Sequence, residues 1–402
     1  MQVGVVGAGI QGSVCASILV RKTEIERVIL IDRDGGRLEA CTEMIRSKKL
    51  SVVLADAAHL KEIVKALEGC EVCFDLLLPE YAGRIMTASL AVGANYINTA
   101  FDYPFWNQIV QKRELYLDAE FKKAGRSAVL GCGNSPGMVN VFVKKYCDRL
   151  SRVDSIQIYG AYEKSQGDVL QGWNPGWSRK QAYLDFVTDP CVFQDGQYTI
   201  KKPFDEREKF NFYEYGMCEF SLHSHEESYS LPYVIGKGLQ SCKFKYEIDP
   251  AAALLYSLGF RRDRVLCIDG RNVEPMRVLL KMLEEKRKCD EPIKEHEEER
   301  LRGYASLIKI RGYDGKYNRE TAFVLPPLYA DRKTVLEKFG TLYIDVALPA
   351  VIAMECIGTL KSGISFAEEI DSDEFIRKLN RYVTYSEILI YDKKWERDET
   401  PQ

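Results

Sequence analysis

The chain opens on the strand-like segment Gln2-Val3-Gly4-Val5-Val6, which runs directly into the glycine-rich turn Gly7-Ala8-Gly9-Ile10-Gln11-Gly12. Glycines at this spacing permit a tight turn and a close approach of the backbone to a pyrophosphate, whose charge meets the N-terminal dipole of the next helix. The flanking pattern is the required one, because residues 13–21 read as a helix and residues 28–31 as a buried strand ending at Asp32. The pattern therefore predicts a dinucleotide-binding unit rather than an ordinary turn between a strand and a helix.

Asp32 and Arg33 bear on which dinucleotide is bound. A carboxylate at the end of the second strand accepts hydrogen bonds from the adenosine ribose and repels a 2′-phosphate, so Asp32 favours NAD. Arg33 could instead pair with that phosphate through its guanidinium group. We expect NAD as the cofactor, and NADP stays open.

Strand-like and helix-like segments go on alternating after Asp32. We expect strands over residues 51–56, 71–78, 95–100 and 127–133, and helices over residues 58–67, 81–92 and 104–123. Strands joined by helices of this length require right-handed crossovers and a parallel sheet that is covered on both faces. Residues 1–130 are therefore predicted to form a doubly wound Rossmann domain of the α/β class.

A 402-residue chain is longer than one hydrophobic core usually serves, so a second domain is expected. The pattern changes near residue 153 to β-rich segments, which predict a mixed or antiparallel sheet: residues 155–162, 218–224, 240–247 and 306–310. We assign residues 131–335 to this inserted α+β domain, which we expect to carry the catalytic and substrate groups and the dimer contacts. The apolar helix expected over residues 346–360 should be buried, so residues 336–402 are predicted to return to the Rossmann domain.

A second glycine-rich segment, Gly131-Cys132-Gly133-Asn134-Ser135-Pro136-Gly137, follows the strand expected at residues 127–133. Ser135 suits the N-cap of the next helix, and Pro136 suits its first position. Ligands of open α/β sheets bind at the carboxyl ends of the strands, where glycines let the backbone come close to them. We therefore expect Asn134 to contact the substrate.

The composition limits the partners and the compartment. The formal net charge of −3 gives no electrostatic attraction for nucleic acid or an anionic membrane, and no apolar run is long enough to span a bilayer. The nucleotide strand begins at the second residue, which leaves no room for a targeting peptide. The cysteines are scattered, many among apolar neighbours, as small hydrophobic residues of a reducing compartment would be. We expect a cytoplasmic protein whose partner is a small molecule.

The segment Leu222-His223-Ser224-His225-Glu226-Glu227-Ser228-Tyr229 concentrates groups that can exchange a proton. As a strand, it would place His223, His225 and Glu227 on one face and Glu226 on the other. His225 is the first choice for proton exchange because imidazole titrates near neutrality, with Glu226 as its companion and Glu227 as a substrate contact. Two other interpretations stay open, a solvated face of an edge strand and a metal site. We expect no metal, because the sequence offers no clear third ligand.

Two further segments hold candidate residues. In Trp173-Asn174-Pro175-Gly176-Trp177-Ser178-Arg179-Lys180, Arg179 could clasp a carboxylate and Trp177 could wall the pocket, although the segment also reads as a turn with core tryptophans. Tyr103 follows the strand expected at residues 95–100 and could reach the nicotinamide side of the cleft, although a lone tyrosine usually only packs. We count Tyr103 among the catalytic candidates.

Short motifs run in a fixed order along nearly the whole chain: Gly7 to Gly12, Asp32-Arg33, Asp56, Leu77-Leu78-Pro79, Tyr96-Ile97-Asn98-Thr99, Gly131 to Gly137, Asn174-Pro175, Trp177-Ser178, Asp195-Gly196, Leu231-Pro232 and Ser362-Gly363-Ile364. In this order they resemble the saccharopine dehydrogenase-like family, which includes saccharopine reductase, carboxynorspermidine and homospermidine synthases and lysine 6-dehydrogenase. Each motif is weak alone, and the shared order makes the resemblance specific.

The resemblance implies a nucleotide domain interrupted by a catalytic domain, C-terminal helices that return to the first domain, and a homodimer. It places Asp56-Ala57 near the adenine, Leu78-Pro79 and Asn98-Thr99 near the nicotinamide ribose, and the segment around Trp177 and Arg179 beside the substrate. The chain departs from the family at Glu80, where a second proline is common, and at Asn98, where an aspartate is common. Both departures concern the geometry beside the nicotinamide.

The resemblance further implies an NAD(P)-dependent oxidoreductase that acts on a C–N bond of an amino acid or polyamine-like substrate, with hydride passing to or from an imine carbon. Such a transfer requires that the substrate be positioned against the cofactor and that a nearby group exchange a proton with the nitrogen. His225 would be that group. One alternative is an amino acid dehydrogenase that releases ammonia, as lysine 6-dehydrogenase does. The other is a dinucleotide-binding sensor without catalysis, which the departures at Glu80 and Asn98 permit.

Overall fold

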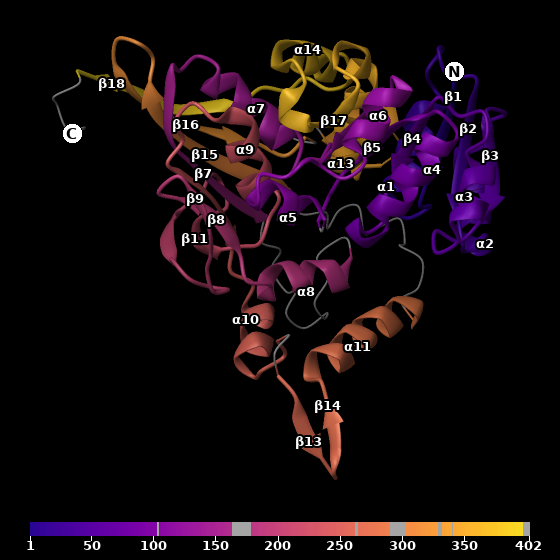
Figure 1. Ribbon diagram of the computed structural model, residues 1–402, viewed down its shortest axis with the longest axis horizontal. Coiled ribbons are helices and arrows are strands. Elements are labelled where there is room, and N and C mark those ends of the chain that lie inside the picture. The colour runs from indigo at the N-terminus through magenta and orange to yellow at the C-terminus, as the bar shows by residue number, and fades with distance from the viewer. Residues whose placement is uncertain are drawn as a thin grey trace. The chain divides into compact units, whose positions relative to one another are not determined.

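The computed structural model describes residues 1–102, 104–162, 178–261, 264–289, 303–328, 332–339 and 341–396 (Figure 1). The chain divides into two compact units. The first comprises Met1–Ser151, Tyr229–Lys237 and Leu328–Ser386, and the second comprises Arg152–Ser228, Gly238–Pro327 and Glu387–Gln402. Each unit is built around its own large sheet.

The first unit contains a seven-stranded sheet in the order β17-β6-β5-β4-β1-β2-β3, and every neighbouring pair is parallel. Its strands are β1 (Gln2–Val6), β2 (Arg27–Asp32), β3 (Leu50–Leu54), β4 (Val72–Asp75), β5 (Asn95–Asn98), β6 (Ser127–Leu130) and β17 (Gly363–Phe366). Its helices are α1 (Ile10–Leu19), α2 (Gly35–Ile45), α3 (Leu60–Ala66), α4 (Ala82–Ala91), α5 (Phe105–Val110), α6 (Asp118–Ala124), α7 (Met138–Cys147), α12 (Arg332–Phe339), α13 (Ile344–Cys356) and α14 (Ser372–Tyr382), with short 3₁₀ turns η1 (Pro79–Tyr81), η4 (Ile357–Thr359) and η5 (Ala367–Glu369). Consecutive residues such as Leu30 and Ile31 are fully buried, so both faces of the sheet are covered. The predicted doubly wound Rossmann fold is confirmed.

The single helix predicted over residues 104–123 is wrong, because two shorter helices, α5 and α6, stand in its place. Between them the Gln108 side chain accepts the N–H of Tyr116 at 2.8 Å, and the Gln108 carbonyl accepts the N–H of Arg113 at 2.8 Å. Leu117 then takes a left-handed φ of 64°, which a continuous helix cannot contain.

The helix after β6 begins later than predicted. α7 starts at Met138, so Ser135 is not its N-cap and Pro136 is not its first residue. Gly137 precedes it with a φ of +130°, and a Cβ at this position would overlap the carbonyl oxygen of Gly133. The chain therefore makes a compact turn between Gly133 and Gly137 that only a glycine at position 137 permits.

The C-terminal part of the first unit completes its sheet. α13 is apolar on nearly all sides, and it packs against α1. β17 lies beside β6, and Figure 1 shows α13, α14 and β17 in gold among purple elements from the start of the chain. The division differs from the expected one in detail, because α7, Tyr229–Lys237 and the chain from Leu328 belong to the first unit, while residues 387–396 belong to the second.

The second unit contains a nine-stranded sheet with the main order β10-β11-β12-β7-β15-β16-β18, in which β8 also pairs with β12 and β9 pairs with β8. The strands are β7 (Arg152–Tyr162), β8 (Cys191–Gln194), β9 (Gln197–Ile200), β10 (Glu208–Asn211), β11 (Met217–Leu222), β12 (Ser241–Glu247), β15 (Tyr304–Tyr313), β16 (Asn318–Leu325) and β18 (Ile388–Trp395). β12 and β7 are parallel and the other pairs are antiparallel, so the sheet is mixed, as predicted. The helices α8 (Arg179–Val187), α10 (Pro250–Ser257) and α11 (Pro275–Cys289) pack together around Tyr183, and β13 (Leu266–Ile268) pairs with β14 (Arg271–Val273) in a separate hairpin.

No single helix in the described part of the chain is both long enough and apolar enough to cross a membrane. The segments Lys333–Phe339 and Ile344–Thr359 meet the length and composition requirement only as a pair, which is bent by 59°.

Candidate active site

The glycine-rich turn between β1 and α1 has the shape that a dinucleotide phosphate needs. Gly7 has a φ of +106°, and a Cβ on Gly12 would overlap the carbonyl oxygen of Gly7, so both positions require glycine. A Cβ on Gly9 would meet no atom within 4 Å, so the space beside this residue is open. Gly9 is also the N-cap of α1, whose N-terminal N–H groups and dipole favour an anion. The residues present therefore fit a pyrophosphate.

The carboxylate of Asp32, at the end of β2, is fixed by backbone donors. One of its oxygens accepts the N–H of Ala8 at 2.7 Å, and the other accepts the N–H of Asp34 at 2.9 Å. These bonds tie the carboxylate to the glycine-rich turn and leave lone pairs for ribose hydroxyls. Arg33 is exposed, and its guanidinium lies 4.0 Å from the carboxylate of Asp56.

The other residues predicted to hold the cofactor follow the carboxyl ends of three parallel strands. Asp56 and Ala57 follow β3, Leu78 and Pro79 lead into η1 after β4, and Asn98 and Thr99 lie at and just after the end of β5. The carboxyl ends of parallel strands meet at one edge of a sheet, which is where doubly wound folds bind nucleotides. The fold therefore brings these residues to the same edge as Gly7 and Asp32, and their contacts with a cofactor stay predictions.

Asn98 has a structural reason to stand where the family commonly has aspartate. Its Nδ2 group donates to the Tyr96 hydroxyl at 3.2 Å, and its Oδ1 atom accepts the N–H of Gly131 at 2.8 Å. The Tyr96 hydroxyl donates to Asp75 at 2.8 Å, and burial raises the pKa of Asp75 to about 6. Asn98 thus joins the end of β5 to the start of the loop after β6, and Tyr96 extends this connection to Asp75 at the end of β4.

Asn134 is buried, and its side chain donates a hydrogen bond to the carboxyl group of Asp345 in the first turn of α13. Burial raises the pKa of Asp345 to about 6, although hydrogen bonds from Asn134 and the backbone lower it. Nothing in the sequence singles out Asp345, because an acid at the start of an apolar helix reads as an ordinary partner of the helix dipole. It is a candidate that sequence reasoning missed.

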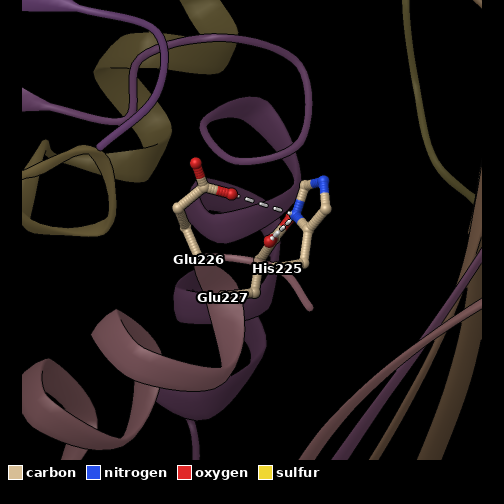
Figure 2. Close-up of side chains that lie close together, drawn as sticks. All are labelled: His225, Glu226 and Glu227. Atoms are coloured by element: carbon tan, nitrogen blue, oxygen red, sulfur yellow. Dashed lines mark hydrogen bonds and ion pairs between the residues drawn. The ribbon is translucent and has the colours of Figure 1, made fainter. Parts of the chain in front are cut away.

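In the second unit, His225, Glu226 and Glu227 converge on one point (Figure 2). β11 ends at Leu222, close to the end of the strand expected over residues 218–224, and α9 (Glu227–Ile235) begins only five residues later, so the strand considered for residues 222–229 does not form. The His225 carbonyl accepts the N–H of Ser228 at 3.3 Å, which turns the chain into α9 and places both glutamates on the same side of His225.

The three side chains form a tight, largely buried group. The Nδ1 atom of His225 makes a short hydrogen bond with the Glu227 carboxylate and lies 3.4 Å from a carboxylate oxygen of Glu226. The Glu227 side chain is fully buried, while those of His225 and Glu226 are 16% and 11% exposed. His225 can therefore still be reached from outside, whereas Glu227 can only hold the ring.

Burial and charge set different protonation states in this group. Burial by itself would lower the pKa of His225, but Glu227, Glu226 and Asp185 outweigh it and raise this pKa to about 9. Burial raises the pKa of Glu226 to about 8, with His225 opposing and Glu227 and Asp185 assisting. Burial and the neighbouring His225 charge lower the pKa of His223 well below its ordinary value. At neutral pH, His225 is therefore a cation, Glu226 is largely protonated and His223 is neutral.

Aromatic rings surround the same group. The ring of His225 stacks on Phe244 with centroids 4.2 Å apart, and that of His223 stacks on Tyr246 at 4.9 Å. Phe186 meets His223 edge-on at 4.7 Å, and its neighbour Asp185, also on α8, adds the negative charge that sequence reasoning missed. Carboxyl groups among aromatic faces suit a cationic nitrogen.

Some predicted residues fall outside this description. Tyr103 and Trp177 lie outside the described residues, and Arg179 is described only through its backbone, as the first residue of α8. Ser178 caps that helix, and its hydroxyl accepts the N–H of Gln181 at 3.3 Å. The roles of Tyr103, Trp177 and Arg179 stay predictions.

His225, Glu226 and Glu227 also offer donor atoms of the kind that bind metals. One such atom from each residue lies within 4.8 Å of the others. The expectation that a third ligand was missing overlooked this convergence, because a strand would have turned Glu226 away. The short bond between His225 and Glu227 already occupies Nδ1 and a carboxylate oxygen, so the arrangement suits a shared proton better than a metal ion.

Comparison with known proteins identifies the first domain. Residues 3–129 match the family described as the saccharopine dehydrogenase NADP binding domain. Over 295 residues, the chain is 24% identical to the carboxyaminopropylagmatine dehydrogenase of Synechocystis sp., a match that covers 71% of this chain and 72% of that protein. Over 319 residues, it is 25% identical to the carboxynorspermidine synthase of Vibrio cholerae, covering 69% of this chain and 71% of that protein.

Two solved structures share the fold over the whole chain. Saccharopine dehydrogenase (L-Glu forming) from Saccharomyces cerevisiae has a TM-score of 0.66 at 14% identity, covering 98% of this chain and 99% of that one. Homospermidine synthase from Legionella pneumophila, solved with NAD, has a TM-score of 0.64 at 14% identity, covering 100% of this chain and 93% of that one. At this identity the likeness shows the fold alone.

The fold and the glycine-rich turn from Gly7 to Gly12, called the cradle below, define a dinucleotide-binding protein. The comparisons support an NAD(P)-dependent oxidoreductase. The predicted resemblance to the saccharopine dehydrogenase-like family is confirmed by the match of residues 3–129 to its NADP binding domain and by the similarity to the two relatives. The expected class of cofactor, a nicotinamide dinucleotide, is confirmed with it.

Proposed function

We propose that this protein is an NAD(P)-dependent oxidoreductase that acts at a C–N bond of an amino acid or polyamine-like substrate, between an imine and an amine. The observation that carries the proposal is the buried pair of His225 and Glu227 with Glu226 beside it. Ionisable groups with strongly perturbed pKa values concentrate at functional sites. The names of the two relatives, a carboxyaminopropylagmatine dehydrogenase and a carboxynorspermidine synthase, support an amine-containing substrate.

His225 manages the proton in this proposal. Glu227 holds the Nδ1 atom of the ring, which leaves Nε2 to exchange a proton with the substrate nitrogen. In the reductive direction, His225 gives its proton to the imine nitrogen, and in the oxidative direction it takes a proton from the amine nitrogen. The bound dinucleotide supplies or accepts the hydride.

Glu226 and Asp185 fit a substrate that carries a positive nitrogen. Asp185 adds negative potential around His225, a cationic nitrogen bound nearby would favour ionisation of Glu226, and Phe244 and Tyr246 add aromatic faces. We further propose that Trp177 and Arg179 wall the pocket and bind a substrate carboxylate, as the sequence predicts.

We propose NAD as the preferred cofactor. Asp32 is held in place by Ala8 and Asp34, so its charge would stand against a 2′-phosphate. Arg33 lies near Asp56, and this carboxylate competes with a phosphate for its guanidinium. The expected result is a lower Kd for NAD than for NADP, with Asp32→Ala narrowing the difference; tighter NADP binding by the unaltered protein would refute it.

We also propose a homodimer formed through β18, the edge strand of the second sheet. Its residues Ile388, Leu389 and Ile390 are 45%, 54% and 54% exposed, whereas β10 at the opposite edge begins with Glu208 and Lys209. Exposed apolar edge strands are usually covered by a partner. Light scattering should give the mass of two chains for the unaltered protein and of one chain for Leu389→Lys. A single-chain mass for the unaltered protein would contradict the proposal.

We also propose the cytoplasm as the compartment. The cysteines of the described residues are free and most of them are buried, as fits a reducing environment.

The test of the main proposal follows the absorbance of NADH or NADPH with mixtures of amines or amino acids and 2-oxo acids or aldehydes. We expect oxidation of the reduced cofactor only when an amine and a carbonyl compound are both present. His225→Gln should lower kcat by about 10²–10⁴-fold, whereas the exposed His59→Gln should not change it. Unchanged turnover in His225→Gln would refute the role of His225.

The same assay separates the two alternatives. A lysine 6-dehydrogenase-like enzyme would reduce NAD with an amino acid alone and release ammonia. A sensor would show dinucleotide-dependent thermal stabilisation and no turnover with any mixture. The buried and perturbed group around His225 favours an enzyme over a sensor.

A further inference from the structure

One carboxyl group stands at the edge of the first sheet where the second half of a dinucleotide belongs. The cradle at Gly7 and Gly12 follows β1, and Asp32 at the end of β2 marks the adenosine side. The nicotinamide side of such a site therefore lies toward the ends of β4, β5 and β6. The first turn of α13 lies at this edge and carries Asp345.

Three contacts fix that turn. The N–H of Ala347 donates to the Gln11 side chain, next to the cradle, at 3.1 Å. The side chain of Val346 lies 3.4 Å from the position of a Cβ on Gly133, in the loop after β6. Asn134 of the same loop donates to Asp345 itself. The turn therefore contacts both the segment after β1 and the loop after β6, and these flank the ends of β4 and β5.

Among the described residues, no cationic side chain forms an ion pair with Asp345. The groups that bond its carboxyl are the Asn134 amide and backbone N–H groups, all of them neutral. Its pKa of about 6 leaves it mostly ionised at pH 8. A carboxylate held in this way exerts its field on whatever binds beside it.

We propose that Asp345 faces the nicotinamide ring and favours its oxidised, positively charged form over the neutral reduced form. The proposal deepens the cofactor part of the proposed function and does not depend on the amine chemistry. It makes Asp345 a residue that sets the relative affinity for the two redox states. Asn134 acts through Asp345 as a positioning residue.

The competing explanation is that Asp345 only stabilises the start of α13. Asp373 provides a matched control, because it is an acid in the first turn of α14 and is exposed. Asp373→Asn should therefore remove a similar favourable interaction between an acidic side chain and the dipole of its helix, without changing the ratio of the Kd values of NAD⁺ and NADH. A purely structural role predicts the same outcome for the two variants.

The experiment measures the Kd of NAD⁺ by calorimetry and of NADH by fluorescence at pH 8. In Asp345→Asn, the Kd of NAD⁺ should rise roughly tenfold relative to that of NADH, the order expected for unit charges about 10 Å apart at an effective dielectric constant of about 20. Asp345→Glu and Asp373→Asn should keep the original ratio. An unchanged ratio in Asp345→Asn, even with both affinities weakened, would overturn the proposal.

Two further measurements keep the proposal testable if Asp345→Asn does not fold. Asp345→Ser is a second neutral variant, and circular dichroism shows which variants are folded. In the unaltered protein, the Kd of NAD⁺ should not exceed that of NADH, and a marked preference for NADH would overturn the proposal without any variant. If no amine and carbonyl mixture supports turnover but the ratio of the Kd values of NAD⁺ and NADH changes as expected in Asp345→Asn, the proposed reaction is refuted and this inference stands.

Discussion

Removal of the Glu227 charge is the most direct perturbation of the group around His225. In Glu227→Gln the side chain keeps its shape and can still bond the ring, but the largest of the factors that raise the pKa of His225 is lost. Burial, which lowers this pKa, is then opposed only by Glu226 and Asp185. We expect the pKa of His225 to fall from about 9 to 6.5 or below. A fall of this size corresponds to about 3 kcal/mol of interaction between the imidazolium and Glu227.

The sign of the effect on stability follows from the raised pKa. A histidine with a folded-state pKa of about 9 and an ordinary value of 6.5 stabilises the fold fully below pH 6.5. That contribution is lost as the pH rises from 6.5 to 9. Glu226 adds to the same trend, because its raised pKa of about 8 makes ionisation costly in the folded state. In Glu227→Gln, the part of the alkaline loss that comes from His225 should disappear.

The assay is an NMR titration of the histidine ring signals, assigned with His225→Gln. The chain has only four histidines, so the spectrum is simple. Glu62→Gln serves as the control, since it removes a similar partner, 3.3 Å away, from the exposed His59 and should leave the His225 signals unchanged. The reasoning is refuted by a His225 that titrates near 6.5 in the unaltered protein, or near 9 in Glu227→Gln.

Three further predictions concern the cradle, a buried acid and a metal. Gly12→Ala should abolish dinucleotide binding in a thermal-shift assay, because its Cβ would overlap the Gly7 carbonyl, whereas Gly358→Ala, at a position with free space and no left-handed φ, should still bind. Burial raises the pKa of Glu368 to about 7, so the stability of the fold should fall as the pH rises from 4.5 to 7. Glu368→Gln should remove the part of that slope that comes from Glu368 and raise the Tm at pH 8 but not at pH 4; an unchanged slope would contradict the prediction. Prolonged dialysis against a chelator should leave turnover unchanged, and a loss that zinc or manganese restores would assign His225, Glu226 and Glu227 to a metal instead.

The first unit could be predicted closely because its signals are local. Each strand is a short apolar run, and the cradle with Asp32 fixes the order of the first two strands. The error over residues 104–123 has a physical cause, since the break depends on the side chain of Gln108 and the left-handed Leu117, for which no glycine or proline signals a turn. The late start of α7 depends similarly on contact between Gly133 and Gly137.

The site could be predicted only as a set of residue types. The alternation His223, Ser224, His225 reads as a strand, and only the turn at His225 brings Glu226 to the side of Glu227. Asp185 reaches the group from α8, and Asp345 reaches Asn134 from α13. Contacts between residues so far apart in the sequence arise from tertiary packing, which no local pattern reports.

The protonation states of the site decide in which pH range each direction of the proposed reaction runs. With a pKa of about 9, His225 is a cation at pH 7 and can give a proton to an imine nitrogen. To take a proton from an amine it must first lose its own, which happens only above pH 9. Initial rates of the reductive direction should therefore be high at neutral pH and fall through pH 9, while those of the oxidative direction should rise over the same range.

The overall equilibrium also shifts with pH, so the profile alone does not identify His225. Glu227→Gln separates the two effects, because it lowers the pKa of His225 without changing the equilibrium of the reaction in solution. In this variant, the fall of the reductive rate and the rise of the oxidative rate should both shift to lower pH by about two pH units or more, together with the pKa measured by NMR. If the rates still change near pH 9 while the NMR signal of His225 titrates at a lower pH, the exchanged proton belongs to another group. Glu226 is then the first to examine, because its pKa of about 8 lies in the same range.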